Sequence, residues 1–515
     1  MDALRAGLRD REGFRVVWQQ AGRAKRRRIT RFVDAKVSLD WSVHSNDVAT
    51  LTRGVVERVF VSTCDSRDGG YGRPPVPAVS EVTAGLERFT NAFKKEVRGL
   101  TPWTIDEFVD SRPRNRAAYK IAGERLARRG LQAKDARVAT FVKAEKLNLT
   151  KKRDPVPRVI QPRSKAYNIA LGRYIAPLER VIYGTIARVY GGKVVFKGMN
   201  ARQQGELMAA KWRNVRDPVA IGIDIKRMDQ HISTSLLKWE HKIFDLFYHS
   251  RRLRRLLSKQ LRNVGRGRCC DGQVDYEVEG SRMSGDMTTA QANSLVMAAV
   301  LWELFQQFPN HHIELANNGD DCVIICPRSI AHAVAVAAPP HLARFGLPAA
   351  MEPPVCMLEE VVFCQTQPVW DGEFWTMVRD PRVCLDKDNC SLKPIRTKRE
   401  WNTLRASVGL SGLALAGNMP IMKAYYSALA RGAGTRTDRD ATDTGMRMLA
   451  RGMDTADLPI TDESRCSFAR AFGVSVPNQL ALEAIFDMAS PTWCEPGPGG
   501  GATDSVVRGL MGSHD

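Results

Sequence analysis

The sequence predicts a fold of the α+β class, because strand-like and helix-like patterns alternate across residues 216–326. In residues 218–225, valine and isoleucine recur at every second position, which is the period of a β-strand. Two short apolar runs within residues 313–325 flank an Asn-Gly pair, a pattern typical of a β-hairpin. Residues 284–305 begin as a polar loop and continue as a predicted helix. Strands and helices are therefore expected within one unit.

Outside this central region the patterns are weaker. Residues 115–150 look helical, and a Lys/Arg/Pro-rich stretch follows that its prolines keep extended. The segment 491–501 is rich in proline and glycine and is expected to be flexible. With 515 residues the chain is long enough for roughly two to four structural units.

The composition indicates a globular protein with a strongly basic surface. Apolar residues make up 43% of the chain, which argues against wholesale disorder. The 77 Lys+Arg residues outnumber the 56 Asp+Glu residues and give a net charge of +21. Such a surface attracts polyanions, and nucleic acid is the commonest one. Affinity for an anionic membrane, or solubility alone, would also account for the charge.

The cysteines and the apolar stretches argue against several other classes of protein. The eleven cysteines contain no Cys-x-x-Cys pair, so we expect no structural zinc site and a reducing, intracellular environment. The N-terminus lacks the apolar core of a secretory signal. The longest apolar stretch, Leu295–Trp302, is too short to span a bilayer, so no transmembrane segment is expected.

Two aspartates follow the strand pattern. Alternation places Asp224 on the face opposite the isoleucines, beside the small residues Ala220 and Gly222, where a metal ion or ligand would have space. Asp229 follows just beyond the predicted strand. Considered alone, two aspartates at this spacing are more typical of caps and turns.

The predicted hairpin carries Asp320 and Asp321 at its tip. Adjacent carboxylates repel each other unless a cation or water separates them, so an exposed turn is the simpler interpretation of this segment alone. Together with Asp224, however, they supply carboxylates from separate segments, which a pair of metal ions requires. Mg²⁺ prefers such hard oxygen ligands. We therefore predict that Asp224, Asp320 and Asp321 are catalytic and hold two Mg²⁺ ions, which Mn²⁺ could replace.

The loop before the predicted helix is rich in small hydrogen-bonding residues. Ser284 and Gly285 lead toward the helix, and Asp286 is expected to cap it. Thr289 and Asn293 place further polar groups near the helix start, where a nucleotide or template could be held. Plain capping and helix packing is the alternative interpretation of this segment.

Several cations lie on the proline-rich extended segment. Cations on an extended ribbon can reach a triphosphate and the departing pyrophosphate. A solvated loop explains the same pattern equally well. The residues concerned are Lys143, Lys146, Lys151, Lys152, Arg153, Arg158 and Arg163.

In their order along the chain, these segments resemble the RNA-dependent RNA polymerases of tombusvirus-like plant viruses, the carmovirus type in particular. The resemblance extends from about residue 46 to residue 388, and the motifs are highly specific in combination. They are the basic element in residues 141–174, Asp224-x4-Asp229, Ser284-Gly285-Asp286-Met287-x-Thr289, Gly319-Asp320-Asp321-Cys322 and Phe363-Cys364-Gln365.

The resemblance implies a right-hand polymerase fold of fingers, palm and thumb, in which the palm is a small antiparallel sheet backed by helices. The implied division is an N-terminal extension contributing to the fingers in residues 1–110, fingers with the basic motif in 111–215, palm in 216–365, thumb in 366–490 and a flexible tail in 491–515.

The resemblance also implies roles for the remaining residues in RNA synthesis, the attack of an RNA 3′-hydroxyl on the α-phosphate of a ribonucleotide. Asp229 and Asn293 would recognise the ribose 2′-hydroxyl. Ser284, Gly285 and Thr289 would support that pocket, and Lys143, Lys146, Arg158 and Arg163 would hold the triphosphate. RNA would contact Lys151, Lys152, Arg153, Phe363, Cys364 and Gln365. Residues 321–360 contain no lysine to protonate pyrophosphate, which leaves His341 as a candidate general acid.

The expected partners are single-stranded RNA template, nascent RNA, ribonucleoside triphosphates and a membrane-anchoring viral replication protein. The expected location is the host cytoplasm, at membrane-associated replication complexes. Three alternatives remain: a reverse transcriptase-like polymerase, a non-enzymatic RNA-binding replication scaffold and a metal-dependent nuclease. A reverse transcriptase would have the same two-metal site, and an RNA-binding scaffold would explain the charge. A nuclease could use the same aspartates.

Overall fold

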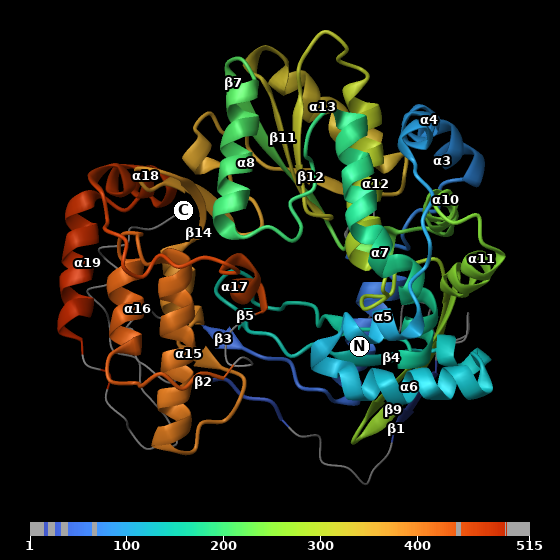
Figure 1. Ribbon diagram of the computed structural model, residues 1–515, viewed down its shortest axis with the longest axis horizontal. Coiled ribbons are helices and arrows are strands. Elements are labelled where there is room, and N and C mark those ends of the chain that lie inside the picture. The colour runs from blue at the N-terminus through green and yellow to red at the C-terminus, as the bar shows by residue number, and fades with distance from the viewer. Residues whose placement is uncertain are drawn as a thin grey trace.

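The computed structural model describes residues 15–18, 26–31, 40–63, 70–438, 444–489 and 491, and it mixes helices and strands as the sequence predicts. The tail expected to be flexible, 491–515, lies outside the described residues except for Pro491. Figure 1 shows a sheet with helices on both faces at the top, a second group of strands and helices at the lower right, and the C-terminal helices at the left.

A four-stranded antiparallel sheet is formed by the central segments, in the order β10-β11-β7-β12. The predicted strand is β7 and the predicted hairpin is β10–β11, so both predictions are confirmed. The strands are β7 (Pro218–Ile225), β10 (Glu314–Asn317), β11 (Asp321–Pro327) and β12 (Ala349–Met351).

Helices cover both faces of this sheet (Figure 1). The valine and isoleucines of β7 are buried on one face with apolar residues of α7, α12 and α13, and each contributes roughly 1.5–3 kcal/mol. On the other face Ala220 packs against α8, and Asp224 is exposed. The helices are α7 (Lys165–Tyr190), α8 (Ala201–Asn214), α12 (Thr289–Phe305) and α13 (Arg328–Ala343).

A second, five-stranded sheet has the order β1-β9-β8-β4-β6 and is antiparallel except for the pair β4–β8. It corrects the helix expected through residue 150, because helix α6 ends at Arg129 and an alternating segment forms β4. Strands β8 and β9 come from within residues 216–365 but pair with N-terminal strands, so that range is not one compact unit. The strands are β1 (Arg15–Trp18), β4 (Val138–Val142), β6 (Val159–Ile160), β8 (Arg262–Cys269) and β9 (Gly272–Glu279).

Short helices pack around this second sheet and around α7. Leu51 and Val55 of α2 join the core of the five-stranded sheet, and Phe89 of α4 and Phe108 of α5 join the core that includes α7. These helices are α2 (Val48–Val55), η1 (Val56–Phe60), α3 (Val79–Gly85), α4 (Glu87–Glu96), α5 (Ile105–Asp110), η3 (Pro113–Asn115), α6 (Arg116–Arg129), η4 (Ala133–Ala136), α9 (Met228–His231), α10 (Thr234–Asp245), α11 (Arg251–Leu257) and η5 (Ser258–Gln260).

The C-terminal part is mainly helical and shares one apolar core with α8. In the part of the chain that the structure describes, no helix has both the length and the apolar character needed to cross a bilayer. The elements here are η6 (Leu358–Glu360), the hairpin β13 (Thr366–Trp370) and β14 (Trp375–Arg379), α14 (Pro381–Lys387), β15 (Cys390–Ser391), α15 (Lys398–Ala416), α16 (Met422–Ala430), α17 (Thr444–Leu449), α18 (Asp462–Phe472) and α19 (Val476–Met488).

N-terminal segments contact this C-terminal part directly. Strand β2 (Thr30–Arg31) pairs with β15 of the C-terminal part. Strand β3 (Trp41–Ser42) pairs instead with β5 (Leu147–Asn148), which precedes α7. The fully buried carboxylate of Asp386 accepts hydrogen bonds from Arg31 Nη1, at 2.6 Å, and from Trp41 Nε1. We refer to the contacts of Asp386 with Arg31 and Trp41 as the Asp386 clasp.

Candidate active site

The aspartates predicted from separate segments meet at one end of the four-stranded sheet. Asp321 is the first residue of β11, and its Cα pairs directly with that of Asp224 on β7. Residues facing each other on antiparallel strands have Cα atoms roughly 4.5–5.5 Å apart, so their side chains are neighbours. Asp320 immediately precedes this pair, in a turn where Gly319 has a φ of +97°. The sheet therefore brings Asp224 next to the Asp320–Asp321 tip.

The carboxylates at this end of the sheet repel one another. Partial desolvation raises the pKa of Asp320, and the charge of Asp229 raises it further. Desolvation also raises the pKa of Asp321, as do the charges of Asp320 and Asp224. Protein groups alone therefore do not compensate these carboxylates fully.

Glu352 is a further carboxylate at this place that the sequence did not reveal. Its backbone N–H donates to the Gly222 carbonyl at 2.9 Å. Desolvation and the charges of Asp321 and Asp224 raise the pKa of its side chain. A Cβ on Gly222 would lie 2.0 Å from Glu352 Oε2, so the small residue expected to leave space for a ligand leaves space for this side chain.

The donor set fits a divalent cation chemically, because carboxylate oxygens are the ligands that Mg²⁺ prefers and a cation would offset their repulsion. The side chains are not arranged as a finished chelate. Within the described residues, no three His, Cys, Asp or Glu side chains are gathered as a ready-made metal site. Asp224, Asp320 and Asp321 are the residues that would hold such an ion.

Four hydrogen bonds fix the turn that carries Asp320. Asn317 Oδ1 accepts from the Gly319 N–H at 2.8 Å, and the Asn318 N–H donates to the Asp321 carbonyl at 2.9 Å. Asn318 Nδ2 donates to Cys364 Sγ at 2.8 Å. Lys197 Nζ donates to the Asn318 carbonyl at 2.8 Å. Sequence reasoning missed Lys197, because it lies in an irregular connection between α7 and α8.

Asp229, Ser284 and Asn293 form a hydrogen-bonded cluster. Asp229 Oδ1 accepts from Asn293 Nδ2 at 2.9 Å, and Oδ2 accepts from the Ser284 hydroxyl. Asp229 belongs to α9, the single turn that follows β7. Asp229 therefore follows Asp224 along the chain by one short helical turn.

A buried ion pair contacts two members of this cluster, Asn293 and Asp229. Arg282 forms a bidentate pair with Glu240, at 2.5 and 3.1 Å, and both side chains are almost fully excluded from water. Arg282 Nε also donates to Asn293 Oδ1 at 2.7 Å, and its backbone N–H donates to the Asp229 carbonyl at 2.7 Å. Neither Arg282 nor Glu240 was predicted, because a contact between residues 240 and 282 leaves no local pattern in the sequence.

The loop before α12 contacts the basic segment rather than capping the helix. Gly285, with a φ of +123°, lies against the backbone of Pro162, where a Cβ would come within 3.1 Å of its nitrogen. Thr289 Oγ1 donates to the Met283 carbonyl at 3.4 Å. Asp286 was expected to cap α12, but its buried carboxylate instead accepts from Arg163 Nε at 2.5 Å. The cap prediction is wrong because ion pairing with Arg163 orients the carboxylate away from the helix start.

The same contacts correct the role expected for Arg163. Its side chain is almost fully buried, and it also donates to the Asn263 side chain and to the Ala136 carbonyl, both at 2.5 Å. A guanidinium occupied in this way joins the loop before α12 to η4 and β8, and it is not available to a triphosphate. Lys146 is also directed elsewhere, because its Nζ donates to the Lys387 carbonyl at 2.8 Å in the C-terminal part.

Other cations of the basic segment remain at the surface. Arg158 and Lys143 both pair with Glu145, at 3.2 and 2.8 Å. The charge of Arg158 also opposes the rise in the pKa of Asp320, so its guanidinium lies within electrostatic reach of the aspartates. Three further predicted cations are exposed: Lys151, Lys152 and Arg153.

The segment predicted to contact RNA after the palm is a tight turn, and its residues face different ways. Cys364 and Gln365 both have positive φ values, 53° and 62°, between the paired backbones of Phe363 and Thr366. Gln365 is exposed. Burial, with the charge of Asp321, raises the pKa of the Cys364 thiol to about 12, so the thiol stays neutral beside the aspartate turn.

Two candidate residues are excluded by burial. Phe363 is fully buried against Phe196, with ring centroids 5.0 Å apart, so it is a core residue and not an RNA contact. His341 is buried as well, and its Nε2 lies 2.9 Å from the Val300 carbonyl, beside Phe345. It therefore faces the C-terminal half of α12, whereas Asn293 lies in the first half, and the geometry does not favour it as a general acid.

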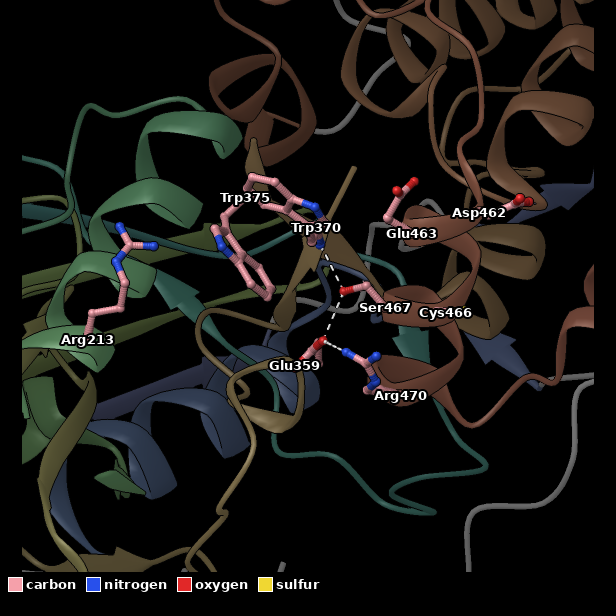
Figure 2. Close-up of a pocket in the computed structure, with 9 residues that line it drawn as sticks. All are labelled: Arg213, Glu359, Trp370, Trp375, Asp462, Glu463, Cys466, Ser467 and Arg470. Carbon is pink, nitrogen blue, oxygen red and sulfur yellow. Dashed lines mark hydrogen bonds and ion pairs between the residues drawn. The ribbon is translucent and has the colours of Figure 1, made fainter. Parts of the chain in front are cut away.

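A cavity of about 580 Å³ lies away from these residues, between the β13–β14 hairpin, α8 and α18. Figure 2 shows Trp370 and Trp375 on one wall and the pair Glu359–Arg470 at its base. None of the predicted site residues lines it. A second cavity, of about 570 Å³, reaches Gln230 and Ser281. Gln230 follows Asp229 in the chain, and the Ser281 hydroxyl donates to the Asp229 carbonyl at 3.4 Å.

With this geometry described, comparison with known proteins identifies the class of the protein. The family model for viral RNA-dependent RNA polymerases matches residues 15–493, and the chain belongs to this family.

Individual relatives are polymerases of plant viruses. The chain is 38% identical over 470 residues to the RNA-directed RNA polymerase of Tobacco necrosis virus (strain A), covering 90% of this chain and 64% of that protein. It is 37% identical to the RNA-directed RNA polymerase of Melon necrotic spot virus, covering 88% of this chain and 58% of that protein. For the enzyme of Turnip crinkle virus the identity is 36%, covering 92% and 61%. The chain thus spans about three fifths of the length of these relatives.

Proposed function

We propose that this chain is an RNA-dependent RNA polymerase that replicates and transcribes the genome of a positive-strand RNA virus. The observation that carries the proposal is the register that sets Asp321 of β11 directly opposite Asp224 of β7, with Asp320 in the adjoining turn. Membership of the viral polymerase family gives this carboxylate group its chemical context. The proposed reaction is attack of an RNA 3′-hydroxyl on the α-phosphate of a ribonucleoside triphosphate.

Each group of side chains has a distinct task in the proposed reaction. Asp224, Asp320 and Asp321 would hold two Mg²⁺ ions, which when bound lower the pKa of the attacking hydroxyl and neutralise the triphosphate. Arg158 and Lys143 would attract the triphosphate from the basic segment. Asp229 and Asn293 would bind the 2′-hydroxyl, because their hydrogen-bonded amide and carboxylate provide both a donor and an acceptor.

We further propose the right-hand arrangement for the parts in Figure 1. The four-stranded sheet would be the palm, the five-stranded sheet with helices α2–α6 the fingers, and helices α15–α19 the thumb. Template and nascent RNA would pass between these parts and contact the exposed residues Lys151, Lys152, Arg153 and Gln365. The net charge of +21 supports this proposal, because it favours binding to an RNA backbone with an affinity that falls as salt rises.

Two related proposals concern the cell. The resemblance to tombusvirus-like enzymes suggests a membrane-anchoring viral replication protein as a partner, and replication complexes on membranes of the host cytoplasm as the location. Co-sedimentation of the purified chain with uncharged liposomes, with and without such a partner in them, would test the first proposal, since the basic chain alone should not bind uncharged lipid.

A reverse transcriptase-like polymerase is the second candidate function. The Asp229–Asn293 hydrogen bond supports RNA synthesis over this alternative, because the two side chains together would recognise a 2′-hydroxyl that a reverse transcriptase excludes. A scaffold that only binds RNA would have no use for the facing aspartates.

The test is extension of a primed RNA template with labelled nucleotides and Mg²⁺. We expect incorporation of ribonucleotides and not of deoxyribonucleotides. Asp320→Ala should abolish incorporation while leaving RNA affinity nearly unchanged, and Asp462→Ala, an exposed aspartate on α18, serves as the matched control. Degradation of the template without extension would instead indicate a nuclease. Retention of most of the synthesis rate by Asp320→Ala would refute the metal assignment.

A further inference from the structure

The turn that carries Asp320 is held from outside the sheet by the connection between α7 and α8. Val195 forms a parallel bridge with Asn317. The Phe196 N–H donates to the Asn317 carbonyl, and the Asn317 N–H donates to the Val194 carbonyl, both at 3.0 Å. Residues 194–196 thus run alongside the end of β10. These backbone hydrogen bonds fix the segment that precedes Lys197, so Lys197 lies beside the turn.

The side chain of Lys197 completes this support. Its Nζ donates to the Asn318 carbonyl at 2.8 Å, and a Cβ placed on Gly319 would lie 3.7 Å from the same nitrogen. Asn318 in turn binds the Asp321 carbonyl through its N–H. A single ammonium group therefore contacts the backbone on which both aspartates of the turn depend.

The position of Lys197 is constrained on both sides. Upstream, the backbone hydrogen bonds to Asn317 fix the segment. Downstream, α8 begins three residues after Gly198, where Asn200 Oδ1 accepts from the Gln203 N–H at 2.8 Å and Gln203 Oε1 accepts from the Asn200 N–H at 3.1 Å. Lysine is an expensive residue to keep half-buried, because its charge loses hydration. Burial lowers the pKa of Lys197, and the opposite charge of Asp320 offsets part of that shift.

We propose that Lys197 is a positioning residue for nucleotide addition: its ammonium group holds the Asn318 carbonyl and fixes the turn that presents Asp320 and Asp321. This inference rests on the proposed polymerase function. It assigns no contact between Lys197 and substrate. Lys197 acts through the backbone of the turn and through its fixed positive charge beside the carboxylates.

The experiment compares three substitutions at this position in the full chain. Lys197→Met keeps the length of the side chain but removes the donor and the charge. Lys197→Arg keeps both, and Lys197→Gln keeps a donor without the charge. Lys193→Met is the matched control, because Lys193 is exposed and lies four residues earlier in the same connection.

Two readouts are measured for each variant. The first is single-nucleotide extension with Mg²⁺, analysed as separate kcat and KM values. The second is the rise in melting temperature caused by Mn²⁺ in the absence of RNA and nucleotide. This rise measures cation binding by the protein's own carboxylates, without a contribution from substrate. Residues that orient metal ligands typically affect metal affinity or activity by about 10–100-fold. We expect Lys197→Met to lower kcat by about 10–100-fold and to leave the nucleotide KM nearly unchanged. The Mn²⁺ concentration that gives half of the rise in melting temperature should increase by a similar factor.

The control and the conservative variant decide the outcome. Lys193→Met should match the wild-type chain, and Lys197→Arg should recover most of both losses. The inference is overturned if Lys197→Met behaves like Lys193→Met, or if Lys197→Arg is as defective as Lys197→Met, which would indicate packing alone. If Lys197→Met does not fold, the same comparison is made between Lys197→Gln and Lys197→Arg. Failure of the wild-type chain to extend RNA would refute the proposed function instead, while the Mn²⁺ measurement would still test Lys197.

Discussion

Removing Arg282 from its buried pair with Glu240 should destabilise the protein strongly. Arg282→Met leaves the Glu240 carboxylate without its bidentate partner, although its side chain is fully buried. Breaking a buried pair by removing one partner costs about 3–5 kcal/mol, a large share of the roughly 5–15 kcal/mol by which native proteins are stable. The expected result is a melting temperature lower by several degrees.

A surface pair provides the control for this experiment. Arg328 and Asp217 are also in contact, at 3.1 Å, but both side chains are more than half exposed. Solvent screens an exposed pair and its side chains lose freedom in forming it, so Arg328→Met should change the melting temperature little. If Arg282→Met proved no more destabilising than Arg328→Met, the buried pair would not have the energetic role inferred from its geometry.

A double variant separates stability from nucleotide selection. Replacing both partners, as in Glu240→Leu with Arg282→Met, removes the unpaired charge and should recover most of the stability. It cannot restore the hydrogen bond from Arg282 Nε to Asn293 Oδ1. We therefore expect the double variant to fold well but to discriminate less between ribonucleotides and deoxyribonucleotides. Unchanged discrimination would show that Asn293 does not need Arg282 for its orientation.

Three further predictions follow from the same geometry. Asp229→Ala should relax sugar selectivity, measured as the ratio of ribonucleotide to deoxyribonucleotide incorporation, because Asn293 and Ser284 both bond to its carboxylate; an unchanged ratio would remove its proposed role. The pKa values of Asp320 and Asp321 are raised by desolvation and neighbouring carboxylates, so in the metal-free chain these groups favour folding when protonated and lose that contribution as pH rises through their folded pKa values. A divalent cation binds the ionised form, so the melting-temperature gain from Mn²⁺ should shrink as pH falls from neutral toward those values, and a constant gain would contradict the assignment. Asp386→Asn should weaken the Asp386 clasp by about 1–3 kcal/mol and make residues 26–31 more sensitive to limited proteolysis, with Asp462→Asn as the exposed control.

The sequence predicted those elements whose patterns are local. The alternation in β7 and the Asn-Gly turn between β10 and β11 are confirmed, because each depends on neighbouring residues. The meeting of Asp229, Ser284 and Asn293 was expected from the order of the motifs, and the structure places them in one cluster. Family likeness was the decisive addition, since spacing alone did not distinguish a binding site from ordinary turns and caps.

Long-range contacts account for most of what the sequence did not reveal. Lys197, Glu352 and the pair Arg282–Glu240 support the site from segments that carry no motif of their own. The errors have the opposite cause. Arg163 and Phe363 lie within recognisable motifs, but both are buried. Arg163 forms an ion pair with Asp286, and Phe363 packs against Phe196 in the core. A motif identifies residues of one segment, and only the fold shows which of their side chains remain accessible.

The Asp386 clasp has a consequence for how the protein is made on the ribosome. Arg31 and Asp386 are separated by 355 positions. At about 5–20 residues per second, roughly 20–70 s would pass between the emergence of the first residue and that of the second. Throughout that interval β15 has not been made, so a nascent chain that stalls before residue 386 would leave the edge of β2 exposed to proteases and to aberrant pairing. Completion of the clasp is thus a late step in the maturation of the protein.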